Sequence, residues 1–357
     1  MATVTNFEGN AMTLNLATTT TARKAYDLVN ELQAYLVAKL DSLPPAPNSS
    51  RFSPVSWLRA EGTSGGGTRY VATDEQLFNR ASVNVSQVQY ENDPTKKMGS
   101  ATAVSTIVHP RRPDMPSVHM HISWTEMKDG SGYWRIMGDL NPAQTNAADK
   151  MLFEQAFRDA VSEELCSYGT AQGSEYFYIP ALKRHRGVAH FYLEAHNSGS
   201  FDTDLTMAQR FGRTIIETYH KISHSHITTP VQLTTADWSS QLNYHSIYFL
   251  QVLTLDRGTT SGLLVHSEND VGILGSLPSH ADKALLRSYV PLLPAIQQKL
   301  LSNLVDALPD GPTSLVDDKV KTRLAAIVRQ FYQEHPEAQE LMARAEKLAP
   351  TLKNHRG

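Results

Sequence analysis

Residues 109–125 contain several histidines and arginines, the residue types that acid–base chemistry needs. Residues 117–125 alternate between polar and apolar types, and this two-residue period is typical of a half-buried strand. His119 and His121 then share the polar face, where imidazole can transfer protons because its ordinary pKa is close to neutrality. Just upstream, His109 and Arg111 lie in a proline-flanked corner. Each proline there restricts its own backbone and that of the preceding residue.

A carboxylate, Asp139, lies at the end of the next strand-like run, directly after Gly138. An ionised carboxylate accepts several hydrogen bonds at once, so it can receive several donors from a ligand. The alternative is an aspartate that caps a turn before Pro142. The residues alone leave both roles open.

The 14 histidines of the chain include two pairs whose spacing can present two imidazoles to one metal ion. One pair is His119 with His121, and the other is His220 with His224 on an expected helix, close to His226. No carboxylate accompanies either pair in a recognised ligand motif. We therefore predict no metal site, and we interpret the second pair as a solvated helix end.

The elements that must position these residues form helical and strand-like blocks. Apolar spacing predicts amphipathic helices over residues 25–40, 146–166, 205–222, 279–304 and 317–348. Alternating or β-branched runs predict strands within residues 67–90, 117–125, 188–196 and 245–278, with a turn at 256–258. Because helices and strands do not alternate strictly, and no glycine-rich nucleotide loop follows a first strand, we predict an α+β fold with an antiparallel sheet.

Composition limits the remaining function classes. The chain has 357 residues, is 41% hydrophobic and 19% charged, and has a net charge of -3 at pH 7, which is ordinary for a globular protein. No dense run of lysine and arginine indicates a nucleic-acid partner. The single cysteine, Cys166, excludes an intrachain disulfide and favours a cytoplasmic location. We find no signal-peptide pattern and no apolar run long enough for a membrane span.

An ordered series of short motifs covers most of the chain. The motifs are Gly65-Gly66-Gly67-Thr68-Arg69, Phe78 to Ser86, Ser105 to Pro113, Pro116 to His119, Gly138 to Pro142, Arg186-Gly187, Asp256 to Leu263 and Ser276-Leu277-Pro278. Each motif alone is weak. In their order and approximate spacing, from about Lys24 to Leu304, the chain resembles the oxygen-dependent coproporphyrinogen III oxidases of haem biosynthesis.

The resemblance implies a fold and an activity. The fold is α+β, with a large flat antiparallel sheet between two layers of helices, and members are usually homodimers. The activity uses dioxygen to convert two propionates of coproporphyrinogen III into vinyl groups, which releases carbon dioxide and gives protoporphyrinogen IX. It implies no metal or organic cofactor, and the expected partner is a porphyrinogen-like small molecule.

The resemblance also implies roles for residues of this chain. It implies that Asp139 faces the N–H donors of the macrocycle, that His119 donates a proton and that Arg186 belongs to the same catalytic group. The matching positions for substrate binding are Ser105, His109, Arg111, His121, Asp256 and Arg257. For the two arginines, Arg186 and Arg257, surface or dimer salt bridges are the alternative to contacts with propionates.

Three departures from the family pattern affect the expected substrate. An asparagine and an arginine are replaced by His121 and Ser123, a Gly-Gly-Arg segment by Ser267-Glu268-Asn269, and a glycine triplet by Ile136-Met137-Gly138. Arg112 and Arg135 are candidates to compensate for the lost cations. Two alternatives to the family activity stay open: a tetrapyrrole-binding homologue without turnover, and an enzyme that acts on another carboxylated substrate.

We expect three regions along the chain. These are a polar leader over residues 1–23, a coproporphyrinogen oxidase-like domain over residues 24–306 and a helical C-terminal extension over residues 307–357. Apolar residues at helical spacing in the extension are typical of a face that packs on its own domain. An additional dimer or partner contact is the alternative.

Overall fold

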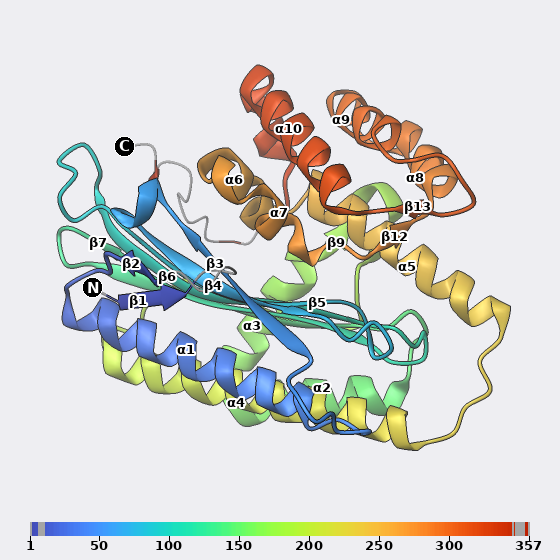
Figure 1. Cartoon of the computed structure of the whole chain (residues 1–357), viewed down its shortest axis with the longest axis horizontal. Coiled ribbons are helices and arrows are strands. Elements are labelled where there is room, and N and C mark those ends of the chain that lie inside the picture. The colour runs from blue at the N-terminus through green and yellow to red at the C-terminus, as the bar shows by residue number, and fades with distance from the viewer. Residues whose placement is uncertain (1, 6–10, 345, 347–353, 356–357) are drawn as a thin grey trace.

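A seven-stranded antiparallel sheet lies at the centre of the structure, a computed structural model that describes residues 2–5, 11–344, 346 and 354–355. Its strands, in spatial order, are β11(Ala189–His196), β8(Gly132–Asn141), β7(Ser117–Met127), β6(Met98–Pro110), β5(Phe78–Gln89), β4(Gly65–Ala72) and β3(Phe52–Leu58). Helices cover both faces of this sheet (Figure 1). The expected α+β fold, with a sheet between two helical layers, is confirmed.

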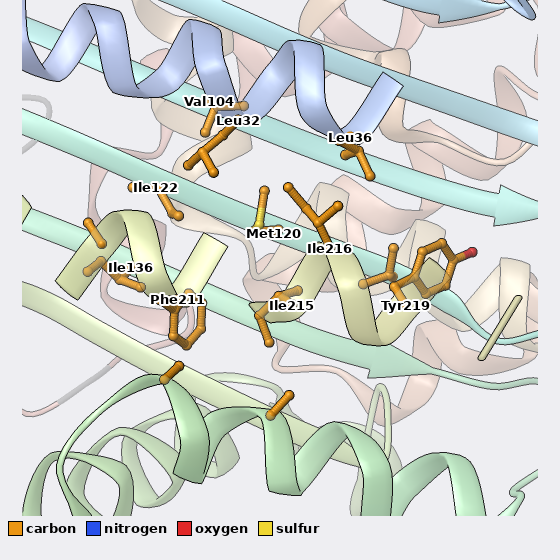
Figure 2. Close-up of a cluster of buried hydrophobic side chains, with 14 of the residues drawn as sticks. Leu32, Leu36, Val104, Met120, Ile122, Ile136, Phe211, Ile215, Ile216 and Tyr219 are labelled. Carbon is orange, nitrogen blue, oxygen red and sulfur yellow. The ribbon is translucent and has the colours of Figure 1, made fainter. Parts of the chain in front are cut away.

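One helical layer packs on the apolar face of the sheet. It contains α1(Thr20–Asp41), α2(Ala147–Ala160) and α4(Phe201–Thr228). Figure 2 shows Leu32 of α1 and Phe211 of α4 beside Met120, Ile122 and Ile136 of the sheet, all within one buried apolar cluster. The predicted helices at 25–40 and 205–222 are therefore confirmed. The alternation predicted along residues 117–125 is confirmed too, since its apolar members face this layer.

The predicted helix over residues 146–166 is two helices. α2 ends at Ala160, and Ser162 caps α3(Glu163–Tyr176), its hydroxyl accepting a hydrogen bond from the Leu165 N–H at 3.3 Å. The sequence pattern missed this break because apolar spacing continues through it. α3 then lies along the edge strand β11. A Cβ at Gly169 would come within 2.3 Å of the Phe191 ring, so only glycine permits this close approach.

The opposite layer contains the helices that follow α4 in the chain. They are α5(Thr235–Thr254), α6(Arg257–Val265), α7(Asp270–Ile273), α8(Lys283–Tyr289), α9(Ala295–Asp306) and α10(Asp318–Glu334). Three short two-stranded sheets pair β1(Ala2–Thr5) with β2(Ala11–Leu14), β9(Tyr178–Ile179) with β10(Arg184–His185), and β12(His280–Ala281) with β13(Ser314–Leu315). In the described part of the chain, no helix is long and apolar enough to cross a membrane.

The strands predicted within residues 245–278 are wrong, because this segment is almost entirely helical. Residues 244–254 of α5 are all buried, since the helix lies between the sheet and the outer helices. A helix that is apolar on every side has no helical period, and a short buried strand gives the same pattern. The turn expected at residues 256–258 is the start of α6, where the Asp256 carboxylate caps the helix. The β-branched and aromatic side chains of α5 fill a core instead of a pleated surface.

The C-terminal helix α10 packs into the same apolar core as α5 and α9. Leu324, Val328 and Phe331 of α10 belong to one buried cluster with Phe249 of α5 and Leu300 of α9. The apolar face of α10 is thus covered by the chain's own helices, whereas Leu341, beyond α10, is 39% exposed and Leu348 lies outside the described residues. The division of the chain into three regions remains an expectation.

A partly buried ion-pair group connects α4 to two other elements, and we expect it to make stability depend on pH. The imidazole of His226 lies 2.7 Å from the Asp149 carboxylate of α2 and 3.5 Å from that of Asp114, between β6 and β7. Hydrogen bonds to Asp114 and Asp149 raise the pKa of His226 from 6.5 to about 9. Because the pKa is higher in the folded state, the pair stabilises the fold fully below the unfolded pKa. That contribution is lost as the pH rises through about 9.

We therefore expect His226→Gln to lower the free energy of unfolding by about 1 to 2 kcal/mol at about pH 6, after allowance for solvent screening, and by much less at about pH 10. Urea unfolding at both pH values measures the difference. His224→Gln, an exposed position two residues away, is the matched control. Equal losses at both pH values would contradict the prediction.

Candidate active site

A cavity of about 290 Å³ lies between the polar face of the sheet and the helices α5, α6 and α7. β5, β6, β7 and β8 form its floor. Its other walls include Tyr248 of α5, residues of α6 and Ile273 of α7. The two histidines predicted to share one strand face, His119 and His121, both line it, so that prediction is confirmed.

The antiparallel register arranges the floor in three rows across the strands. The first row is Ser82, Ile107, His119 and Asp139, the second is Asn84, Ser105, His121 and Met137, and the third is Ser86, Ala103, Ser123 and Arg135. Small side chains on β5 and β6 leave room above the sheet. The ionisable side chains lie on β7 and β8. The floor therefore offers space for a ligand over β5 and β6, and acid–base and charged groups over β7 and β8.

Asp139 is the centre of a buried hydrogen-bond group that includes all three residues expected to be catalytic. The His119 Nδ1 lies 2.9 Å from one oxygen of Asp139, while a guanidinium N–H of Arg186 and the amide of Asn141 (2.6 Å) donate to the other. Arg186 also donates to the Gln251 side chain at 2.7 Å. Asp139 is 0% exposed. His119 and Arg186 line the cavity directly in front of this carboxylate.

The charges of this group are mutually stabilising. Burial raises the pKa of Asp139, but the nearby charge of Arg186 and the hydrogen bonds from His119 and Arg186 outweigh burial and hold that pKa well below its ordinary value. Arg186 also lies over the rings of Phe177 and Tyr248, at 4.4 and 4.9 Å. The carboxylate is therefore ionised at neutral pH, and Nδ1 of His119 donates to it. This leaves Nε2 as the ring nitrogen available to a ligand in the cavity.

Two more of the expected residues lie in the floor. His121 is bonded through Nε2 to the Ser123 hydroxyl at 3.0 Å. Burial, with the charges of Arg135 and His119, lowers the pKa of His121 to about 3, so its imidazole is neutral at pH 7. Ser105 lies beside His121 in the same row and lines the cavity. Both side chains can exchange hydrogen bonds with a neutral ligand group.

His109 and Arg111 do not line the cavity. The His109 ring is 0% exposed and lies 2.9 Å from the Ser117 hydroxyl and 3.1 Å from the Ser276 carbonyl oxygen. It thus connects the sheet to the helical layer above it. Arg111 is exposed. The His109 ring also packs against the ring of Tyr248, a cavity residue, at 4.7 Å between ring centres, so His109 borders the site without lining it.

Asp256 and Arg257 are adjacent in the chain, and only Asp256 lines the cavity. The Asp256 carboxylate accepts a hydrogen bond from the Thr259 N–H at 2.6 Å and so caps α6. Arg257 pairs with Glu194 of β11 at 3.1 Å, and Arg135, which lines the cavity, pairs with the same carboxylate at 3.0 Å. Of the two arginines considered as compensating cations, Arg135 is thus at the site. Arg112 is not, because it pairs with Asp114 in the β6–β7 corner.

Several cavity residues were not found from the sequence. Tyr248 was hidden by the incorrect strand assignment, and nothing in the pattern distinguishes His266 or His355 from other polar residues. Asn84 could have been predicted from the sequence, because Ser82, Asn84 and Ser86 are polar residues at alternate positions along β5. That alternation places Asn84 on the face that forms the cavity floor.

The histidine pairs considered for metal binding are occupied by other contacts. His119 and His226 are held by carboxylates, and His220 is bonded to the Ser42 hydroxyl at 3.0 Å. Within the described residues, no group of three or more histidine, cysteine, aspartate or glutamate side chains is arranged to hold a metal ion.

Comparison with known proteins gives consistent results. A family described as coproporphyrinogen III oxidase matches residues 24–289. The chain is 31% identical over 254 residues to an oxygen-dependent coproporphyrinogen-III oxidase of Rickettsia felis, and 30% identical to the protein of that name from Rickettsia akari. Each alignment covers 68% of this chain and 87% of the relative. The cavity residues from Ser82 to Ser276 lie within the matched region, and the chain belongs to the coproporphyrinogen III oxidase family.

Proposed function

We propose that this protein catalyses the oxygen-dependent oxidative decarboxylation of coproporphyrinogen III to protoporphyrinogen IX. For each of two propionates, the side chain loses carbon dioxide and two further electrons and becomes a vinyl group. Dioxygen accepts those electrons and, with protons, leaves as hydrogen peroxide. One propionate, one dioxygen and one proton thus give one vinyl group, one carbon dioxide and one hydrogen peroxide. No metal or organic cofactor enters this balance.

The observation that best supports this proposal is the paired arrangement of His119 and Arg186 in front of one buried carboxylate. A substrate propionate requires a cation, and Arg186 provides a guanidinium at the cavity wall. The reaction also requires proton transfer, and His119 presents Nε2 beside that cation. Because Asp139 is enclosed by its partners, we assign it the positioning of both residues. Direct acceptance of pyrrole N–H donors by Asp139 requires those partners to move.

The remaining walls suit a macrocycle that carries carboxylates. Tyr248 and Val252 of α5 offer apolar area above the polar floor, while Arg135 places a second guanidinium on β8. Covering helices of this kind restrict the access of bulk water to reactive oxygen species. We also propose that the protein is a homodimer and that it is cytoplasmic. Size-exclusion chromatography with light scattering tests the first proposal, and cell fractionation tests the second.

The experiment that tests the function measures anaerobic binding and aerobic turnover of coproporphyrinogen III by the purified protein. Protoporphyrin fluorescence after chemical oxidation reports the product. Turnover supports the proposal. Tight binding without turnover supports the second candidate, a tetrapyrrole-binding homologue, which the loss of family arginines at Ser123 and Asn269 favours. Absence of both binding and turnover contradicts the two candidates together.

We expect His119→Gln to lower the turnover number by about 10²-fold or more, because a glutamine amide cannot transfer a proton. The Michaelis constant changes little, since the charge that binds a propionate is that of Arg186. Steady-state kinetics at several substrate concentrations separates the two constants. His335→Gln, on the outer helical layer, is the control. Parental turnover by His119→Gln would remove His119 from the mechanism.

A further inference from the structure

A cluster of basic side chains that the proposed reaction does not use borders one end of the cavity. Its members are Arg59, which follows β3, His266, which ends α6, and His355, from the last described residues of the chain. Both histidines line the same cavity as His119, whereas Arg59 contacts His266 without lining the cavity itself. Asp256 and His266 cap the two ends of α6, so His266 lies about 15 Å along the helix axis from Asp256. The cluster is therefore remote from the part of the cavity where Asp256 lies.

The contacts within this cluster are specific. A guanidinium N–H of Arg59 donates to the Nδ1 of His266, and the rings of His266 and His355 lie 5.7 Å apart, edge to face. The Nδ1 of His355 is 2.9 Å from the Tyr90 hydroxyl, and the Arg59 guanidinium lies 5.3 Å from the Tyr90 ring centre. Sequence positions almost 300 residues apart thus form one group.

The chain end is held at this place by a second contact. The amide of Asn354 donates to the Tyr133 hydroxyl of β8 at 3.1 Å, and Asn354 is 6% exposed. His355 lies outside the region that matches the family, residues 24–289. The C-terminal end of this chain therefore adds a wall to the cavity that the matched region does not contain.

Arg59 differs in its ion pairing from two arginines that line the cavity, Arg135 and Arg186. Arg135 and Arg186 each pair with a carboxylate, Glu194 and Asp139 respectively. No such partner lies within 4.0 Å of the Arg59 guanidinium among residues 2–5, 11–344, 346 and 354–355. A buried or half-buried cation without a counter-ion is costly, and an anionic ligand removes that cost.

We propose that Arg59, His266 and His355 form a carboxylate-binding subsite for a propionate remote from the one that reacts. This inference rests on the proposed function, because it takes the ligand to be a carboxylated tetrapyrrole. The guanidinium provides the charge, and the two imidazoles provide N–H donors from the opposite wall and from the C-terminal end of the chain. Substrate specificity in this protein then depends partly on a residue outside the family region.

The titration behaviour of the histidines agrees with this arrangement. Burial and the charge of Arg59 lower the pKa of His266 to about 3 and that of His355 to about 4. Both rings are neutral while the subsite is empty, and each neutral ring retains one N–H donor. A bound carboxylate opposes the charge of Arg59 and shifts both pKa values upward.

The test compares the binding of two porphyrins that have the same macrocycle but differ in charge. Coproporphyrin III, the stable oxidised form, has four carboxylates, and its tetraamide has none. We expect Arg59→Gln and His355→Gln each to weaken binding of coproporphyrin III about tenfold in fluorescence titration, and binding of the tetraamide less than twofold. Arg59→Lys retains most of the affinity, because the charge remains. The matched control is Arg213→Gln, which removes an arginine that also lies over a tyrosine ring, Tyr35, at 4.4 Å.

Each alternative result has a defined meaning. Equal losses for both probes would show that the cluster only supports the shape of the cavity, and this would overturn the subsite. Parental affinity in both variants would overturn it as well. If the parent protein converts coproporphyrinogen III while both variants keep the parental Michaelis constant, the subsite is wrong and the proposed function remains. If the parent neither binds nor converts the tetrapyrrole, the function fails and the subsite fails with it.

Discussion

Asp139→Asn is expected to lower turnover of coproporphyrinogen III by about 10² to 10⁴-fold, the range for loss of acid–base assistance. The substitution keeps the shape of the side chain but removes the charge that orients the His119 ring. It also leaves Arg186 beside an uncharged amide. Because the asparagine still fills the same space, we expect the cavity itself to persist.

The measurement is steady-state turnover, with thermal unfolding of the same preparations to show that the variant is folded. Asp204→Asn is the matched control, since Asp204 is a buried carboxylate that also contacts a histidine, His196, at 3.2 Å, but lies outside the cavity. We expect that control to retain parental turnover. An Asp139→Asn protein with parental turnover would refute the proposed role of this carboxylate.

Arg186→Met is expected to lower the free energy of unfolding by about 3 to 5 kcal/mol, the usual result of removing one partner from a buried ion pair. Both side chains of the Arg186–Asp139 pair are almost completely buried, at 1% and 0% exposed. The methionine leaves Asp139 as an uncompensated buried charge, and it removes the guanidinium from between Phe177 and Tyr248. Asp139 then gains a proton more readily, because the charge that lowered its pKa is gone.

Urea unfolding at neutral pH measures this loss, and Arg186→Lys separates charge from geometry. Lysine keeps the charge but cannot bond Asp139 and Gln251 at the same time, so we expect an intermediate loss. Arg213→Met is the control for an exposed ion pair, where we expect about 0 to 1 kcal/mol. A parental unfolding free energy for Arg186→Met would show that the pair contributes nothing to stability.

Both predictions concern the cationic side chains at the cavity. Few of them are available to bind the carboxylates of a ligand, because most are already paired with a carboxylate of the protein. Arg186, the cation to which we assign one propionate, shares its charge with Asp139, and Arg135 is paired with Glu194. Two segments that contain arginine in the family contain Ser123 and Asn269 here. A substrate with four carboxylates must therefore find part of its charge compensation elsewhere, and the cluster at Arg59 is one place that can provide it.

Much of the sheet was predictable from the sequence because its strands are covered by helices on one face and border a polar cavity on the other. That asymmetry gives a strict two-residue alternation, and it correctly placed His119 and His121 on one face. α5 was not predictable for the opposite reason. Residues 244–254 are all buried, and uniform burial removes the period that distinguishes a helix from a strand.

The sequence by itself determined the family, the α+β fold and the identity of the central ionisable residues, because motif order and strand alternation are local properties of the chain. Only the tertiary structure decided which of those residues meet. Strand register brings His119 beside Asp139, while His109 packs against Tyr248 without lining the cavity and Arg111 is exposed. Packing of the chain end places His355 at the cavity, a contact with Tyr90 across 265 residues. Contacts of such long range depend on how whole elements pack together, and no local pattern records them.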